Sequence, residues 1–414
     1  MPPTTHPHPY AEDTCKDEHG ATDGAVVTTR TGQLYAAAPL TDAVVEVPLF
    51  DIARELEGLR FEAAAIFERI WTSASFTFGA DLEEFEERFA DFCGAEHCVG
   101  VSDGTAAIQL GLLALGVEAE ACVVTVPNTF VATVEAIAAA GARPRLVDVD
   151  RGHRCMDPDR LSAAIDAETA AVVPVHLFGR LAPMPEISGI CARRAVPVLE
   201  DAAQAHGATL ARVRAGAWGD AAAFSFYPSK NLGAAGDAGA VVCRGDDTAD
   251  ALRSLRHHGS LPGRPNRHAR QGGTHRLDNL QAALLVLRLS RLQEANEQRR
   301  RAAALYRELL AELPLTLPMP DGDDEEQVYH LFVVEVEDRD EVLAALRERG
   351  IAAAVHYPTP IHLQPAWHDL GYGRGDFPVA EHLADHCLSL PCFAGITEEE
   401  QTFVAQELAE ALHR

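Results

Sequence analysis

Apolar residues recur along the chain in two patterns, one typical of helices and one typical of buried strands. Apolar side chains at helical spacing predict the first clear helix over residues 81–93. Asp81 and Glu84 have the spacing of a capping box and are expected to begin this helix. Beyond it, short apolar runs typical of strands are separated by helical patterns. The runs span residues 97–101, 122–126, 145–149, 170–175, 196–199, 221–226 and 239–243.

Strands and helices that alternate in this way predict an α/β layer with a large, mostly parallel sheet. A long helical pattern follows over residues 277–313, then a strand over 329–336 and a helix over 339–349. We therefore expect a large α/β domain over residues 46–285. A long connecting helix and a small α+β C-terminal domain are expected over residues 286–414.

Composition and charge narrow the class of protein. Residues 1–45 lack a periodic apolar pattern, which predicts a mostly disordered extension. The net charge of −27 over 414 residues argues against nucleic acid or an anionic membrane as a partner. No apolar stretch is long enough to span a bilayer. The nine cysteines include no C-x-x-C pair and the N-terminus has no signal-peptide pattern, so we expect a cytoplasmic protein with reduced thiols.

The chain lacks both G-x-G-x-x-G and G-x-x-x-x-G-K-[ST], which disfavours dinucleotide-binding and P-loop proteins. Four other features occur where a predicted strand meets a helix or a loop. The first is Ser-Asp-Gly-Thr at residues 102–105, directly after a strand. Backbone N–H groups of Gly104 and Thr105 at a helix N-terminus can bind an anion such as phosphate. A simple N-cap turn is the alternative interpretation.

The second feature is the acidic pair Glu200 and Asp201 at the end of the apolar run 196–199. Ligands of open α/β sheets bind at the carboxyl ends of strands, and a carboxylate there can keep a pyridine nitrogen protonated. A cap for the next helix is the alternative. The third feature is Phe130, which follows another strand and can stack on a flat heteroaromatic ring. A core phenylalanine is the alternative.

The fourth feature is Lys230, which follows an apolar strand and a Pro-Ser turn. A partly desolvated lysine has a lowered pKa and can act as a nucleophile and a base, whereas an exposed surface lysine is the alternative. Ser225 precedes it and can reach a phosphate, and Gly233 indicates a tight turn. The four features together supply an anion cradle, a stacking ring, a pyridinium partner and an amine. Pyridoxal phosphate (PLP) chemistry needs that set.

With these residues the sequence resembles the DegT/DnrJ/StrS-type sugar aminotransferases, a branch of the fold-type I PLP enzymes. The resemblance extends from about Val47 to the C-terminus. It implies a fold-type I transferase with a large, mostly parallel seven-stranded α/β/α domain and a smaller α+β C-terminal domain. The segments that carry it are VPLFD, GVSDGTAAI, PNTFVAT, VPVHLFG, VLEDAAQAHGA, FSFYPSKNLGAAGDAGA, RLDNLQAALL, VHYPTPIH and SLPCF.

The resemblance implies a role for each matching position. Lys230 matches the lysine that forms the Schiff base with PLP, and Asp201 matches the residue that pairs with the pyridine nitrogen. Both are expected to be catalytic. The other expected cofactor-binding residues are Gly104, Thr105, Phe130, Gln204 and Ser225. The expected substrate-binding residues are Tyr227, His356, Tyr357 and His362.

Two departures from the family pattern affect the expected site. Asp103 stands where the family usually has Ser or Asn, so a carboxylate lies beside the phosphate cradle, and we expect it to point away. Residues 272–277 read GGTHRL where the family often has G-x-N-S-R-L. The family works as a homodimer, and the Asn that reaches the partner subunit's phosphate is missing here. Either Thr274 or His275 is expected to replace it, or the loop is rebuilt.

The reaction implied by the resemblance moves an amino group from glutamate or glutamine to a nucleotide-linked keto-sugar, and a dTDP-linked 3-keto-6-deoxy sugar is favoured. An aminocyclitol (keto-inositol) aminotransferase and a non-catalytic PLP-binding paralogue are the alternatives. Related sugar dehydratases carry His at the lysine position, so Lys230 argues against dehydration. His382 and His386 are four residues apart, but no acidic residue completes a zinc motif, and no metal is expected.

Overall fold

The structure is a computed structural model that describes residues 46–261 and 263–413. The predicted disordered extension, residues 1–45, lies outside this part of the chain. Within the described residues, no helix is both long enough and apolar enough to cross a membrane.

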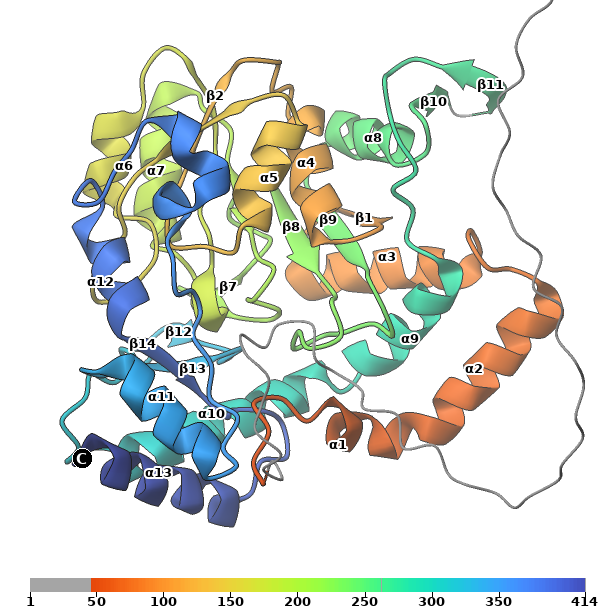
Figure 1. The fold of residues 1–414 in the computed structure, drawn as a ribbon. Helices are drawn as coiled ribbons and strands as arrows, with labels where there is room; N and C mark the ends of the chain where they lie inside the picture. The colour runs from red at the N-terminus through yellow and green to blue at the C-terminus, as the bar shows by residue number, and fades with distance from the viewer. Residues whose placement is uncertain (1–45, 262, 414) are drawn as a thin grey trace, which may run out of the picture. The chain divides into compact units, whose positions relative to one another are not determined.

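A seven-stranded sheet lies at the centre of the described part of the chain (Figure 1). Counted from one edge of the sheet, backbone hydrogen bonds connect the first four strands to one another and the last three to one another. The parallel bridges Val172–Val198 and Val175–Asp201 join these two groups. Among these seven strands only β9 (Gly239–Cys243) runs antiparallel to its neighbours. The predicted mostly parallel sheet is therefore confirmed. In spatial order its strands are β1 (His97–Val101), β9 (Gly239–Cys243), β8 (Ala221–Ser225), β5 (Leu199–Asp201), β4 (Thr169–Val172), β2 (Cys122–Thr125) and β3 (Arg143–Leu146).

Helices cover both faces of this sheet. Successive strand residues point to opposite faces, and in β9 Val241 and Val242 belong to different hydrophobic cores. The arrangement is therefore the α/β/α sandwich that the sequence predicts. One face is covered by α4 (Gly104–Ala114), α5 (Ala132–Ala139) and α8 (Asp246–Leu255). The other is covered by α3 (Ala80–Cys93), α6 (Pro158–Ala164), α7 (Met184–Arg194) and α9 (Asn279–Leu289).

The capping box predicted from Asp81 and Glu84 is wrong. Helix α3 begins one residue earlier, with Gly79 at its N-cap position. The buried side-chain carbonyl of Asn279 accepts a hydrogen bond from the backbone N–H of Leu82 (3.0 Å), and its amide donates to the Asp81 carboxylate (2.8 Å). A residue from α9 thus satisfies the helix N-terminus, which local spacing cannot predict.

The single long helix predicted over residues 277–313 is also wrong, because two helices occupy it. Helix α9 ends before Ser290, whose hydroxyl donates a hydrogen bond to the carbonyl of Leu287 (2.7 Å). A serine hydroxyl that bonds to the preceding turn competes with the helical ladder, which accounts for a break at this point. The second helix is α10 (Leu292–Leu309).

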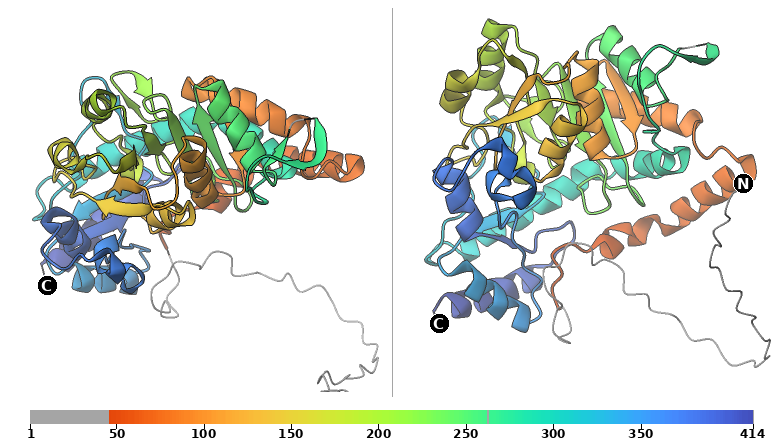
Figure 2. Two further views of the ribbon diagram at one scale, coloured as in Figure 1. Left: turned by 90° about the horizontal axis from the view of Figure 1, so that it is seen from above. Right: turned by 45° about the horizontal axis from the view of Figure 1, so that its top comes forward.

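The C-terminal part has a hydrophobic core of its own, to which Tyr306, Phe332 and Leu408 contribute. Figure 2 shows this part beside the sandwich, with α10 in teal and the later helices in blue. This part is of the predicted α+β type, and the boundary between residues 285 and 286 stays a prediction. Its elements are the antiparallel strands β13 (Phe332–Glu335) and β14 (Cys387–Leu390) with α10, α11 (Arg339–Glu348) and α13 (Glu398–Leu412). The remaining elements include α1 (Ile52–Leu56), α2 (Arg60–Ser73), α12 (Pro378–His386), the hairpin β10 (Ser260–Leu261) and β11 (Arg264–His268), and the short strands β6 (Thr209–Leu210), β7 (Val213–Arg214) and β12 (Glu325–Glu326).

Candidate active site

The carboxyl ends of the parallel strands bring several of the expected cofactor residues to one edge of the sheet. Asp201 is the last residue of β5, and Ser225 is the last residue of β8. Strand β1 leads into the turn that contains Gly104, and β2 leads into the segment that contains Phe130. Because open α/β sheets bind ligands at this edge, the residues lie where a cofactor is expected.

Lys230 follows β8 in a tight turn. Its backbone N–H donates a hydrogen bond to the carbonyl of Tyr227 (2.8 Å). A Cβ atom at Gly233 would lie 2.4 Å from the carbonyl oxygen of Pro228, so the turn requires glycine there. Lys230 is one of only two lysines in the whole chain, the other being Lys16. Lys230 is at least partly buried, which argues against its interpretation as an exposed surface lysine.

Lys230 and Asp201 influence each other's protonation. Burial lowers the pKa of Lys230 to about 8, and the negative charge of Asp201 opposes this shift. Asp201 is 5% exposed, and burial raises its pKa, while a hydrogen bond from Thr133 (2.8 Å) and the charge of Lys230 oppose that rise. A lysine with a lowered pKa holds more of the neutral amine, which is the form that acts as nucleophile and base.

The expected phosphate cradle is packed closely against β8. A Cβ atom at Gly104 would lie 2.6 Å from the Cβ atom of Ser225, so only glycine fits at this turn. The carboxylate of Asp103 caps α4 by accepting hydrogen bonds from the backbone N–H of Ala106 (2.8 Å) and the hydroxyl of Ser102 (2.7 Å). Its own helix therefore holds the Asp103 carboxylate, and its orientation away from a bound phosphate stays a prediction.

Gln204 connects segments that are distant in sequence. Its side-chain carbonyl accepts a hydrogen bond from the backbone N–H of Phe178 (2.7 Å), and its amide donates to the hydroxyl of Tyr357 (3.1 Å). The ring of Tyr357 lies 5.6 Å from the ring of Phe130, centroid to centroid. Phe178 has a φ of 62°, which is unusual for a bulky residue. Tyr357, from the C-terminal part of the chain, thus contacts both Gln204 and the Phe130 ring.

The expected substrate residues have different surroundings. His356 lies edge-on to Tyr357 and 2.8 Å from the Ser389 hydroxyl, and burial lowers the pKa of His356 to about 4. The His356 ring is therefore neutral near pH 7. His362 is buried, and its Nε2 lies 2.9 Å from the Glu381 carboxylate. This pair stabilises the local fold, and contact of His362 with a substrate stays a prediction.

The loop expected to reach the partner subunit begins beside the phosphate cradle. The backbone N–H of Ser102 donates a hydrogen bond to the carbonyl of His275 (3.0 Å). Nearby, the hydroxyl of Thr274 lies 3.4 Å from Nε2 of His258. Residues 251–277 include no Asp or Glu. This stretch of sequence is therefore basic and polar, which suits contact with an anion.

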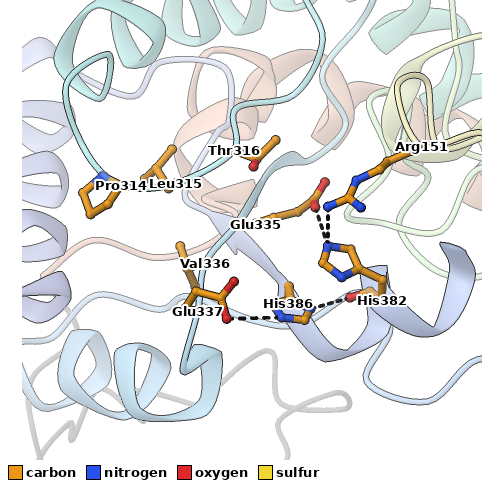
Figure 3. A pocket seen from close by; sticks show the side chains of 9 residues that line it. All are labelled: Arg151, Pro314, Leu315, Thr316, Glu335, Val336, Glu337, His382 and His386. Carbon is orange, nitrogen blue, oxygen red and sulfur yellow. Dashed lines mark hydrogen bonds and ion pairs between the residues drawn. The ribbon is translucent and has the colours of Figure 1, made fainter. Parts of the chain in front are cut away.

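One cavity of about 230 Å³ lies elsewhere and is shown in Figure 3. None of the expected cofactor residues lines it. Its polar side chains contact one another, since Nε2 of His382 lies 3.0 Å from Arg151 and 3.1 Å from Glu335, and Nε2 of His386 lies 3.5 Å from Glu337. We therefore assign it no catalytic role. Across the described residues, no group of three or more His, Cys, Asp or Glu side chains is arranged to hold a metal ion.

The residue that the sequence interpretation missed is Thr133. Its hydroxyl lies against Asp201, although 68 positions separate the two in sequence. The available signal was a hydroxyl side chain shortly after Phe130, in a segment already expected to lie at the sheet edge. Hydroxyl residues at the start of a helix are common, so this signal is weak by itself.

These residues fit PLP. A glycine turn that excludes a Cβ suits a phosphate, the lowered pKa of Lys230 suits a covalent amine, and the buried Asp201 suits a pyridinium. The fold and the site therefore define a PLP-dependent transferase.

Comparison with known proteins identifies the family. Residues 59–409 match the DegT/DnrJ/EryC1/StrS aminotransferase family, and the chain belongs to it. It is 41% identical over 348 residues to a Streptomyces venezuelae protein named dTDP-3-amino-3,4,6-trideoxy-alpha-D-glucose transaminase (83% of this chain, 90% of that protein). It is 39% identical over 368 residues to a Geobacillus stearothermophilus protein named pleiotropic regulatory protein (88% and 98%). An Acidithiobacillus ferrooxidans protein named UDP-N-acetyl-3-dehydro-alpha-D-glucosamine 3-aminotransferase is 39% identical over 368 residues (89% and 98%).

Solved structures agree with this assignment. The crystal structure of S. venezuelae DesV in complex with a ketimine intermediate matches with a TM-score of 0.86 at 40% identity, and covers 89% of this chain and 99% of that chain. The structure of ntda from Bacillus subtilis with bound cofactor PMP matches with a TM-score of 0.84 at 31% identity (91% and 87%). The protein is an aminotransferase, and its cofactor is PLP.

Proposed function

We propose that the protein transfers an amino group from glutamate or glutamine to a nucleotide-linked keto-sugar, and that this sugar is a dTDP-linked 3-keto-6-deoxy sugar. The observation that carries the proposal is the pairing of Lys230, with its lowered pKa, and the buried Asp201 at one sheet edge. The names of the S. venezuelae and A. ferrooxidans relatives support a nucleotide-linked sugar aminated at position 3.

The binding residues have distinct tasks in this proposal. Backbone N–H groups of Gly104 and Thr105, with the Ser225 hydroxyl, bind the cofactor's phosphate at the N-terminus of α4. Phe130 would stack on the cofactor ring, and Gln204 would lie beside it. These contacts orient the cofactor and exclude water from one of its faces. The substrate is expected to contact Tyr227, His356, Tyr357 and His362.

Two residues serve the chemistry directly. PLP, when bound, supplies an electron sink for a carbanion at the reacting carbon. Lys230 would hold the cofactor covalently, and its neutral amine would accept and return the proton of the substrate's reacting carbon. The Asp201 carboxylate keeps the pyridine nitrogen protonated. Lysine rather than histidine at position 230 favours amine transfer over dehydration.

A homodimer is part of the proposal. Helix α2 exposes several large apolar side chains, with Phe61 86% and Trp71 63% exposed, and the Phe67 ring stacks on Trp71 at 5.8 Å. An exposed apolar patch of this kind marks an interface. In the dimer, Thr274 or His275 of one subunit would take the place of the missing Asn at the partner's phosphate.

Trp71→Asp is expected to convert a dimer into a monomer, because a charge placed in an apolar interface is costly to desolvate. Sedimentation velocity measures the change in mass. Glu68→Ala is the matched control, since Glu68 is an exposed polar residue of the same helix and should leave the mass unchanged. A wild-type protein that sediments as a monomer at micromolar concentration would remove the support for an interface on α2.

Substrate class is tested by offering the holoenzyme a panel of keto-substrates with glutamate or glutamine. The expected result is amination of dTDP-linked 3-keto-6-deoxy sugars in preference to UDP-linked keto-sugars and keto-inositols. Preference for a keto-inositol would establish the aminocyclitol alternative. The name of the G. stearothermophilus relative makes a non-catalytic role the second candidate. A bound cofactor whose absorbance no amino donor converts to the pyridoxamine form would support that second candidate.

A further inference from the structure

Two threonine hydroxyls form a hydrogen-bonded chain that ends at the Asp201 carboxylate. Thr133 is buried in the first turn of α5, and its Oγ1 lies 2.8 Å from Oδ2 of Asp201. Thr129 is also buried, and its Oγ1 lies 2.8 Å from Oγ1 of Thr133. The three side chains form a continuous hydrogen-bonded chain in a region where an unpaired polar group would be costly.

The number of hydrogens fixes the direction of these hydrogen bonds. An ionised carboxylate can only accept, so Thr133 donates its single hydroxyl hydrogen to Asp201. Oγ1 of Thr133 is then the acceptor for the hydroxyl of Thr129. Thr129 therefore donates to Thr133 and Thr133 donates to Asp201. The hydrogen bond from Thr133 opposes the rise in the Asp201 pKa that burial causes.

The two oxygens of the Asp201 carboxylate are held unequally. Oδ2 accepts the short hydrogen bond from Thr133, whereas Oδ1 accepts from the backbone N–H of Ala203 at 3.3 Å. Thr133 thus holds Oδ2 firmly. The longer hydrogen bond at Oδ1 is weaker, so Oδ1 can accept a hydrogen bond from a stronger donor. A protonated pyridine nitrogen is such a donor.

We propose that Thr133, with Thr129 behind it, is a positioning residue that fixes the orientation of the Asp201 carboxylate toward the pyridine nitrogen of PLP. The proposal rests on the proposed role of Asp201. Phe130 lies between the two threonines in sequence, and its carbonyl accepts a hydrogen bond from the backbone N–H of Thr133 (3.2 Å). One turn of the chain therefore positions both the expected stacking ring and the expected pyridinium partner.

The test compares Thr133→Val with Thr133→Ser in the PLP-loaded protein. Valine has nearly the shape of threonine but no hydroxyl, and a hydrogen bond to a charged group is worth about a 10- to 100-fold effect, so Thr133→Val is expected to lower kcat by that factor. In Thr133→Val the pyridine nitrogen should hold its proton less firmly, so the ring carries less positive charge. Less positive charge repels other protons on the cofactor less, and the visible absorbance of the bound cofactor should therefore titrate at a higher pH. Thr133→Ser keeps the hydroxyl and should restore both values. A purely structural role would not move the titration.

Thr129→Val is a second test, which can be made even where Thr133→Val fails to fold. It removes the donor behind Thr133 without touching Asp201, and it should shift the titration in the same direction by a smaller amount. Unchanged titrations in both valine variants would overturn the proposal. Asp201→Asn separates this outcome from failure of the proposed function: if it leaves cofactor absorbance and kcat unchanged, the role of Asp201 is wrong. If Asp201→Asn changes the absorbance and kcat but neither valine variant shifts the titration, the positioning role of Thr133 and Thr129 is wrong.

Discussion

Lys230→Ala is expected to abolish amino transfer, with kcat lower by about 10⁴-fold, the upper range for a positioned acid–base group. The variant should also fail to attach PLP covalently. The reason is that Lys230 is the only lysine among the described residues, so no other described side chain offers the site a primary amine. Borohydride reduction of the loaded protein, followed by intact-mass and peptide analysis, measures the attachment. A coupled assay measures the transfer.

The scarcity of lysine supplies a matched control. Lys16→Ala should keep full activity and the full mass increment after reduction, with the modified peptide containing residue 230. The pH dependence gives a second check. Burial lowers the pKa of Lys230 to about 8, so the rate at which apoprotein captures PLP should rise with pH and level off above about 8. Full transamination by Lys230→Ala would contradict the proposed function.

The large domain could be predicted from the sequence because parallel strands are buried on both faces. Such strands are continuous apolar runs that stand out from the helical patterns beside them, as β1 and β9 do at their predicted bounds. The start of α3 could not be predicted in this way. Its donors are satisfied by Asn279, which lies about two hundred residues away in sequence, so the local pair Asp81 and Glu84 gave a false signal.

Among the site residues, too, some could be predicted from the local sequence, whereas others depend on contacts between distant segments. Asp201 and Lys230 could be chosen because Asp201 ends an apolar strand and Lys230 lies in the turn after another, and the carboxyl end of a strand has a known place in an α/β sheet. Thr133 could not be chosen, because its importance depends on how α5 lies against the end of β5. The pairing of His362 with Glu381 was hidden for the same reason, since the spacing of histidines does not indicate which are paired.

Asp201→Asn is expected to lower kcat by about 10²- to 10³-fold, the range for removing one electrostatic group aimed at developing charge. An amide of the same shape cannot hold a proton on the pyridine nitrogen by opposite charge. The bound ring would then be a weaker electron sink, although PLP should still attach to Lys230. The absorbance of the bound cofactor and single-turnover rates with an amino donor measure both effects. Unfolding by denaturant should change little, because burial raises the pKa of this carboxyl and disfavours its charge.

The neighbouring acid provides the contrast that makes this result specific. Glu200 points to the opposite face of β5, where it is fully buried and bonds to His176 (2.8 Å) and to the backbone N–H groups of Trp218 (2.9 Å) and Gly219 (2.8 Å). Burial alone would raise the pKa of Glu200, but the hydrogen bonds from His176, Gly216 and Gly219 hold it below its ordinary value. Glu200→Gln should therefore destabilise the fold and leave the cofactor's absorbance unchanged. Equal effects of the two variants on absorbance would contradict a specific role for Asp201.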